Sequence, residues 1–332
     1  MNDNVKKRIL MGGIVLVLAV ALGIGVYGGS KMSKIHRTDL DEGNLEVSKE
    51  MEEELGDEYL NVAVFGVNAK SKDSDQTDSD AVYIASLNTY TDEVKLVSVY
   101  GNTMMEHEGT TIRLRDAYGE GGPEEAIAVL NANLDLNIKN YVSVDFRAMV
   151  DVINILGGVD INVTEEEIPH INGYAQDIAG VIGEKAKEVT KPGRQMLDGM
   201  QAVGYCRIRV TDGGDVKRGQ RQQAVIAQML ERMQEADFAQ MDKIMDQVFP
   251  EVETNFETSE LLEYGQDASG YTVENLPAFP REIEAQKREE LKEGQQFADF
   301  EEVVQAVDFK GEVETLHKEL FPDVSDSHIR LL

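Results

Sequence analysis

The chain has 332 residues and a formal net charge of −30, because 62 aspartates and glutamates outnumber 32 lysines and arginines. Nucleic-acid binding depends on basic surface, so this acidity argues against a nucleic-acid partner and suits a solvated extracellular domain. Cys206 is the only cysteine, and the five histidines are scattered without metal-ligand spacing. The composition therefore excludes a disulfide framework, a zinc site and cysteine catalysis.

The N-terminal region predicts a membrane anchor. Residues 9–29 carry no charge, and a helix of that length spans roughly 30 Å, the thickness of a bilayer core. The basic residues at 6–8 favour a cytoplasmic N-terminus. A cleaved signal peptide is the alternative. We expect a cytoplasmic tail over 1–8 and an uncleaved, single-pass transmembrane anchor over 9–29, which places the large domain outside the cell membrane.

The rest of the chain predicts a linker followed by one α/β domain. Residues 30–58 are polar and charge-rich, which suggests a linker with a short helix, and residues 59–332 form the expected extracellular domain. Apolar, β-branched runs alternate with helical patterns, which indicates a central mixed sheet flanked by helices. Residues 112–122 are expected as a loop, and 164–193 as an excursion with weak periodicity. We expect strands at 59–68, 81–88, 94–100, 141–146, 159–163, 205–210 and 303–309, and helices at 123–136, 146–158, 194–205, 218–233, 238–249, 259–269 and 313–321.

Four arginines and a glutamine gather within residues 205–223, against the acidity of the rest of the chain. The first two arginines alternate along the expected strand and share one face. After a Gly-Gly turn, the other two and the glutamine stand at i, i+3 and i+4 of the expected helix. These side chains are Arg207, Arg209, Arg218, Arg221 and Gln222.

This spacing predicts an anion site. Guanidinium groups bind phosphate bidentately, and a helix N-terminus adds its own affinity for anions. The alternative is that the arginines pair with the abundant carboxylates on a solvated face.

Several segments together resemble the LytR–CpsA–Psr family of cell-envelope glycopolymer phosphotransferases. The resemblance covers nearly the whole chain, and its last two segments are the most specific. The segments are NVAVFGVN, SDAVYIASLN, VKLVSV, DAYGEGGPEEAI, YVSVDFRAMVDVINILGGVDINV and GRQMLDGMQAVGYCRIR with RGQRQQ.

The resemblance implies a function and a set of site residues. Members of the family bind a polyprenyl-pyrophosphate-linked glycopolymer and transfer it to peptidoglycan as a phosphodiester, with magnesium at the pyrophosphate. The family pattern matches Asp80 and Arg218 as catalytic residues, and Asp80 with Asn68 as the metal position. Its pyrophosphate-binding residues match Arg207, Arg209, Arg218, Arg221 and Gln222.

The chain departs from the family pattern at several positions. Asn68 stands where an aspartate is usual, Asp78 where an arginine is usual, and Gly101-Asn102 where the family has Arg-Asp. Asn68 offers magnesium a neutral oxygen instead of a carboxylate. The missing arginine removes a group that neutralises phosphoryl charge, and losing one such donor costs on the order of 10²–10³ in rate.

Two readings of the family resemblance therefore remain. The chain is a working transferase with an altered metal site, or a non-catalytic relative that binds the lipid-linked polymer as scaffold or competitor. An adhesion or structural wall protein is a third class, and it would need no arginine cluster. Arg113 and Arg115 lie near the altered positions. They either compensate for the missing arginine or are plain surface charges.

Overall fold

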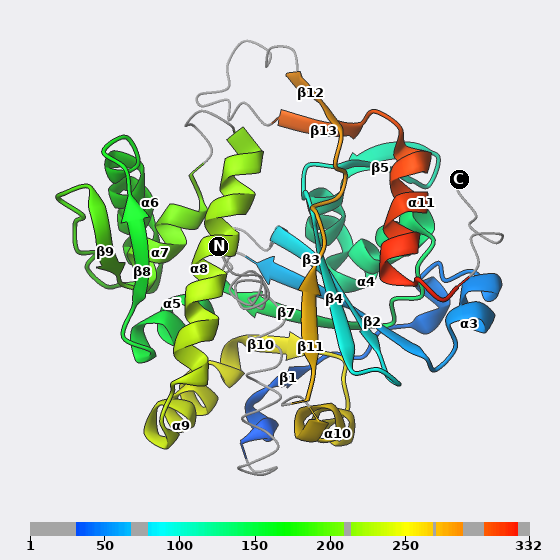
Figure 1. Cartoon of the computed structure of the whole chain (residues 1–332), viewed down its shortest axis with the longest axis horizontal. Coiled ribbons are helices and arrows are strands. Elements are labelled where there is room, and N and C mark those ends of the chain that lie inside the picture. Colours follow the sequence, from blue (N-terminus) through cyan, green and yellow to red (C-terminus); the bar gives the residue numbers. More distant parts are fainter. Residues whose placement is uncertain (1–30, 68–78, 209–213, 268–269, 288–301, 325–332) are drawn as a thin grey trace. The chain divides into compact units, whose positions relative to one another are not determined.

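A computed structural model describes residues 31–67, 79–208, 214–267, 270–287 and 302–324 (Figure 1). The described residues form two compact units, unit 1 over 31–39, 142–208, 214–267 and 270–275, and unit 2 over 40–67, 79–141, 276–287 and 302–324. Across these ranges, no helix combines the length and the apolar character needed to span a membrane. The expected anchor and cytoplasmic tail lie outside the described residues.

Unit 1 combines a small mixed sheet with a group of helices. β1 runs parallel to β10, and β10 runs antiparallel to β7. β8 and β9 form a separate antiparallel pair. The elements are η1 (Met32–Lys34), β1 (His36–Arg37), β7 (Asn140–Asp145, in unit 1 from Val142), α5 (Phe146–Ile155), β8 (Val159–Val163), α6 (Ile168–Ile182), β9 (Gly193–Leu197), α7 (Gly199–Cys206), α8 (Gly214–Gln234), α9 (Phe238–Gln247), η3 (Phe249–Glu251), β10 (Val252–Thr254), α10 (Thr258–Asp267) and β11 (Thr272–Asn275).

Unit 2 is built on the antiparallel strands β2, β3 and β4, with two further antiparallel pairs, β5–β6 and β12–β13. Its core packs the strands against α3, α4 and α11. The elements are η2 (Glu42–Asn44), α3 (Lys49–Leu55), β2 (Tyr59–Val67), β3 (Ser79–Asn88), β4 (Glu93–Val99), β5 (Met104–His107), β6 (Thr110–Arg113), α4 (Leu114–Leu134), β12 (Ile283–Lys287), β13 (Glu302–Ala306) and α11 (Phe309–Leu320).

The expected α/β class, with a mixed sheet flanked by helices, is confirmed. β2 is buried over most of its length, as its nearly continuous apolar sequence predicts for a strand that is covered on both faces. The helix expected at 146–158 is α5, which ends before Gly157 and Gly158, both at positive φ. Glycine adopts this left-handed conformation without strain, so the two glycines end the helix.

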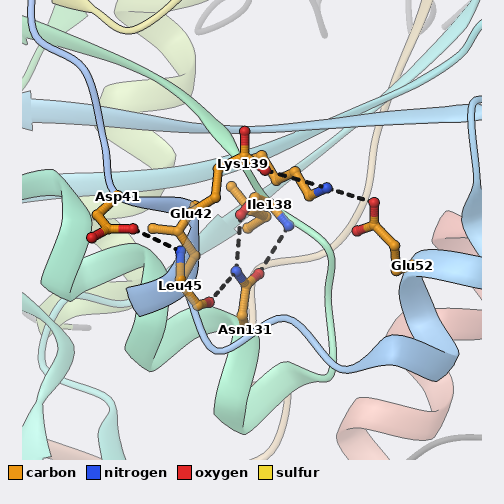
Figure 2. A network of polar contacts seen from close by, with 8 residues as sticks. Asp41, Glu42, Leu45, Glu52, Asn131, Ile138 and Lys139 are labelled. Atoms are coloured by element: carbon orange, nitrogen blue, oxygen red, sulfur yellow. Dashed lines mark hydrogen bonds and ion pairs between the residues drawn. The ribbon is translucent and has the colours of Figure 1, made fainter.

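Residues 40–58, within the stretch interpreted as a linker, pack into unit 2. Leu45 and α3 contribute buried side chains to the core. Figure 2 shows the polar network that holds this segment. Asn131 of α4 donates from Nδ2 to the carbonyls of Leu45 (2.7 Å) and Ile138 (2.9 Å), and its Oδ1 accepts from the Ile138 N–H at 2.9 Å. The buried amide thus joins the segment before α3 to the segment after α4.

The loop expected at 112–122 is in large part helical. α4 already begins at Leu114, and its first turns bury Leu114, Ala117 and Tyr118. These side chains stand at i, i+3 and i+4, so they cover one face of the helix. Gly122 has a φ of 70° and interrupts the helix just before the proline at which the sequence predicted it to start.

Candidate functional site

The prediction of a strand at 205–210 is wrong at its start, because Tyr205 and Cys206 are the last two residues of helix α7. A capping box begins this helix, since Asp198 accepts from the Gln201 N–H and Gln201 accepts from the Asp198 N–H, both at 3.0 Å. Every residue of α7 is buried. Strand alternation therefore does not explain how Arg207 is placed.

Arg207 lies at the C-cap of α7 and is half-buried. Its guanidinium carbon is 5.5 Å from the centre of the Tyr174 ring on α6. A cation over an aromatic face is attracted by the ring's quadrupole, so Tyr174 positions the arginine. Arg209 lies outside the described residues.

The helix expected after the Gly-Gly turn is confirmed as α8, which carries Arg218, Arg221 and Gln222. Arg218 and Arg221 are only 6% and 5% exposed, while Gln222 is half-buried. Residues three apart on a helix lie on the same face, so this face of α8 brings two buried cations together. Charged side chains are rarely buried without partners.

Arg221 forms an ion pair inside unit 1 (α6, α7 and α8 in Figure 1). Its Nε donates to Oε1 of Glu167 at 2.9 Å, and its Nη1 donates to the Ile208 carbonyl at 3.1 Å. The guanidinium carbon also lies 5.7 Å from the centre of the Tyr205 ring. Arg221 therefore ties α8 to the start of α6 and to the residue next to Arg207.

Two hydrogen bonds keep Glu167 ionised. Burial alone raises the pKa of its carboxyl group, but the Thr164 N–H and the Arg221 guanidinium donate to it and hold the pKa below its usual value. The sequence did not identify Glu167 as a site residue, because it is the third of three successive glutamates. Only the fold selects it from its neighbours.

Burial makes the nearby tyrosine and cysteine of α7 unreactive. Desolvation raises the pKa of the Cys206 thiol to about 12, although the charge of Arg221 opposes the shift. The pKa of Tyr205 also rises to about 12, first through burial and then through the charge of Glu167. A thiol is nucleophilic only as its thiolate, so Cys206 is a structural residue.

Unit 2 contains a second polar cluster, formed by Ser79, Asn102 and Thr103. Asn102 is 1% exposed, and the other two are fully buried. Within the described residues, the Asn102 amide oxygen and nitrogen and both hydroxyl groups have no hydrogen-bond partner. Leaving a buried polar group unpaired costs about 1–3 kcal/mol. Buried polar groups in native proteins nearly always have a partner, which can be water, an ion or a ligand.

Arg113 and Arg115 differ in their surroundings. Arg113 donates to both carboxylate oxygens of Asp116, from Nε at 2.6 Å and from Nη2 at 2.7 Å. Arg115 is buried, and its backbone N–H donates to the Gly101 carbonyl at 2.8 Å. Arg113 is therefore paired with a neighbouring carboxylate, and the backbone of Arg115 lies against the altered segment.

The described residues do not form a metal site on their own. Asp80 lies on β3, but its side chain and all of Asn68 and Asp78 are outside the described part. Elsewhere in the described ranges, no group of three or more His, Cys, Asp or Glu side chains is arranged to hold a metal. Asn102 offers only a neutral oxygen, whereas magnesium prefers carboxylates.

A family model and similar known proteins point to the same family. The family model described as the LytR_cpsA_psr family matches residues 22–299. The chain is 28% identical to the polyisoprenyl-teichoic acid–peptidoglycan teichoic acid transferase TagV of Bacillus subtilis (strain 168), over 81% of this chain and 70% of that protein. It is 26% identical to TagT of the same organism, over 87% and 94% of the two chains.

Solved structures show the same fold. A structure of TagT bound to LI-WTA matches with a TM-score of 0.60 at 20% identity, over 87% of this chain and 99% of that one. A structure of a LytR-CPS2A-psr family protein, YwtF (TagT), with bound octaprenyl pyrophosphate lipid matches with a TM-score of 0.57 at 19% identity, over the same shares. The expected family and fold are therefore confirmed.

Proposed function

Because this chain belongs to the LytR_cpsA_psr family, we propose that it transfers a polyprenyl-pyrophosphate-linked anionic glycopolymer to peptidoglycan during cell-wall assembly. The names of its relatives describe transfer of teichoic acid from a polyisoprenyl carrier to peptidoglycan. The observation that carries the proposal within this chain is the buried Arg218 on α8, which shares a helix face with the Glu167–Arg221 ion pair. Burial strengthens the attraction of Arg218 to an anion, because the local dielectric constant is low.

The proposed reaction is a substitution at phosphorus. A peptidoglycan hydroxyl oxygen forms a bond to the phosphorus that carries the glycopolymer. The bond from that phosphorus to the bridging oxygen breaks, and polyprenyl monophosphate leaves with that oxygen. The hydroxyl proton passes to a base, a role that we assign to Asp80. The product is a phosphodiester between glycopolymer and peptidoglycan.

Arginines stabilise the charge that develops on the phosphoryl oxygens. We assign this role to Arg218, and we assign pyrophosphate binding to Arg207, Arg209, Arg218 and Gln222. Arg221 joins this set mainly as the residue that holds the others in place, since Glu167 and Ile208 already accept from it. Magnesium, which would neutralise pyrophosphate charge, is assigned to Asp80 and Asn68 and is expected to bind weakly.

The proposal includes a location. The uncharged run at 9–29 and its basic leader support an N-terminal membrane anchor with the enzyme domain outside the cell. This position would give the domain access to both the lipid-linked polymer and peptidoglycan.

The second candidate function is binding without catalysis. The altered residues Asn68, Gly101 and Asn102 favour it, because each replaces a charged group in the family pattern. The chain would then hold the lipid-linked polymer as a scaffold or compete for it.

One experiment separates the two functions. The full chain in detergent micelles is incubated with a labelled lipid-linked glycopolymer and peptidoglycan. Label on the peptidoglycan together with released polyprenyl monophosphate supports the transferase. Tight binding of the lipid without transfer supports the scaffold, and absence of both rejects the two functions. Arg218→Ala serves as the control for dependence on the arginine cluster.

A further inference from the structure

Gly101 and Arg115 lie against each other in unit 2. The Arg115 N–H donates to the Gly101 carbonyl at 2.8 Å, and the Leu114 N–H donates to the Thr103 carbonyl at 3.0 Å. A Cβ atom built on Gly101 would lie 3.4 Å from Cβ of Arg115 and 3.5 Å from the Ser79 carbonyl oxygen. A side chain at position 101 would therefore begin beside that of Arg115.

Three of the buried polar side chains without a hydrogen-bond partner in the described part of unit 2 belong to this segment or to Ser79 beside it. Asn102 and Thr103 follow Gly101 directly, and the Ser79 backbone contacts the Gly101 position. The Asn102 amide and both hydroxyl groups are buried without a partner in the described part of the chain. A phosphate group accepts hydrogen bonds through several oxygens, so it can pair with an amide N–H and with hydroxyls at once.

The two neighbouring arginines are not equivalent. Arg113 donates two hydrogen bonds to Asp116 in a bidentate pair. Arg115 is buried and begins next to Gly101 and Asn102. A buried guanidinium interacts more strongly with an anion than an exposed one, because water screens it less.

We propose, building on the function above, that Arg115 binds a phosphate group of the lipid-linked substrate together with the Asn102 amide. Arg115 supplies from position 115 the guanidinium that Gly101 cannot supply from position 101. Its planar fork matches two phosphate oxygens, which an ammonium group does not. In this proposal Arg115 is a phosphate-binding residue of unit 2.

The test is binding of octaprenyl pyrophosphate to the full chain in detergent micelles, measured by isothermal titration. Arg115→Gln should weaken binding at least tenfold, and Arg115→Lys by nearly as much. The matched control is Arg113→Gln, which should change affinity less than threefold. The exchange variant G101R/R115A should regain most of the lost affinity, because it returns a guanidinium to the same place.

Thermal unfolding of each variant shows whether it is folded. If Arg115 is purely structural, Arg115→Gln unfolds at a lower temperature and the exchange variant regains no affinity, which overturns the proposal. Wild-type affinity in a folded Arg115→Gln variant also overturns it.

A second probe, inorganic pyrophosphate, separates this proposal from the proposed function. If the wild type binds pyrophosphate in an Arg115-dependent way but does not bind the lipid, Arg115 is a phosphate-binding residue and the lipid-linked substrate is wrong. If the wild type binds the lipid and Arg115→Gln has no effect, only the inference on Arg115 fails. A wild type that binds neither probe overturns both.

Discussion

Glu167 and Arg221 form a buried ion pair, with the Arg221 Nε donating to Oε1 of Glu167 at 2.9 Å. The pair joins the start of α6 to the N-terminal half of α8, and Arg221 also donates to the carbonyl of Ile208. Removing one partner leaves the other charge buried and uncompensated, which is more costly than replacing both. Arg221 is therefore as much a structural residue as a candidate ligand.

The first prediction concerns the stability that this pair contributes. Glu167→Ala should lower the free energy of unfolding by about 3–5 kcal/mol, the cost of breaking a buried pair. The double variant Glu167→Leu with Arg221→Met should recover much of that loss, because no charge remains buried. Urea unfolding followed by circular dichroism measures both. Arg194→Ala breaks the exposed pair with Asp160 and should leave stability unchanged, and equal losses in Glu167→Ala and Arg194→Ala would contradict the prediction.

The second prediction concerns the dependence of stability on pH. The folded-state pKa of Glu167 lies below the usual glutamate value of 4.5, because the hydrogen bonds from Thr164 and Arg221 outweigh the effect of burial. A depressed pKa means that this stability is present above the unfolded-state pKa and is lost as pH falls through the folded-state pKa. Between neutral pH and about pH 4.5 the contribution of Glu167 should therefore stay constant, and it should fall below that.

The measurement is the difference in unfolding free energy between wild type and Glu167→Gln at a series of pH values. The difference is needed because burial raises the pKa of Asp145 and Asp151 in the same unit, which has the opposite sign. Protonation of those two carboxyl groups stabilises the folded state, so their contribution to the free energy of unfolding falls as pH rises. Parallel curves for wild type and Glu167→Gln below pH 4.5 would rule out the prediction.

Local patterns predicted many elements but missed α6 (168–182), within the stretch expected to have weak periodicity, and β9 (193–197), where the helix expected at 194–205 was to begin. The pattern RGQRQQAVIAQML after the glycine turn predicted α8, and helical geometry then placed Arg218 and Arg221 on one face. The strand assigned to 205–210 failed because α7, once begun by the capping box of Asp198, continues through an apolar run that reads equally well as strand or helix. The ion pair of Glu167 joins residues 54 positions apart, and no local pattern contains such information.

The third prediction concerns the arginines that remain candidates for direct contact with pyrophosphate. Replacing Arg207 or Arg218 by alanine should weaken octaprenyl pyrophosphate binding by about 1.5–3 kcal/mol, the scale of a hydrogen bond to a charged group. Lysine should restore little, because it lacks the bidentate fork. Equilibrium binding to the full chain in detergent micelles provides the measurement. Unchanged affinity in a folded Arg207→Ala, Arg218→Ala double variant would exclude this arginine site.

The last prediction concerns magnesium. Asn68 offers a neutral oxygen, so Asp80 alone would give the metal one charged ligand, and magnesium releases its bound waters reluctantly for so little. Wild type should therefore bind magnesium weakly, and chelation should lower its transfer rate less than it lowers that of Asn68→Asp. Asn68→Asp should bind magnesium at least tenfold more tightly, since a second carboxylate adds charge at the ion. Single-turnover transfer in titrated magnesium measures the effect, with Asn162→Asp, an exposed position on β8 of unit 1, as the charge-matched control. Equal magnesium affinity in wild type and Asn68→Asp would show that position 68 does not face the metal, and the weak-site hypothesis would then be wrong.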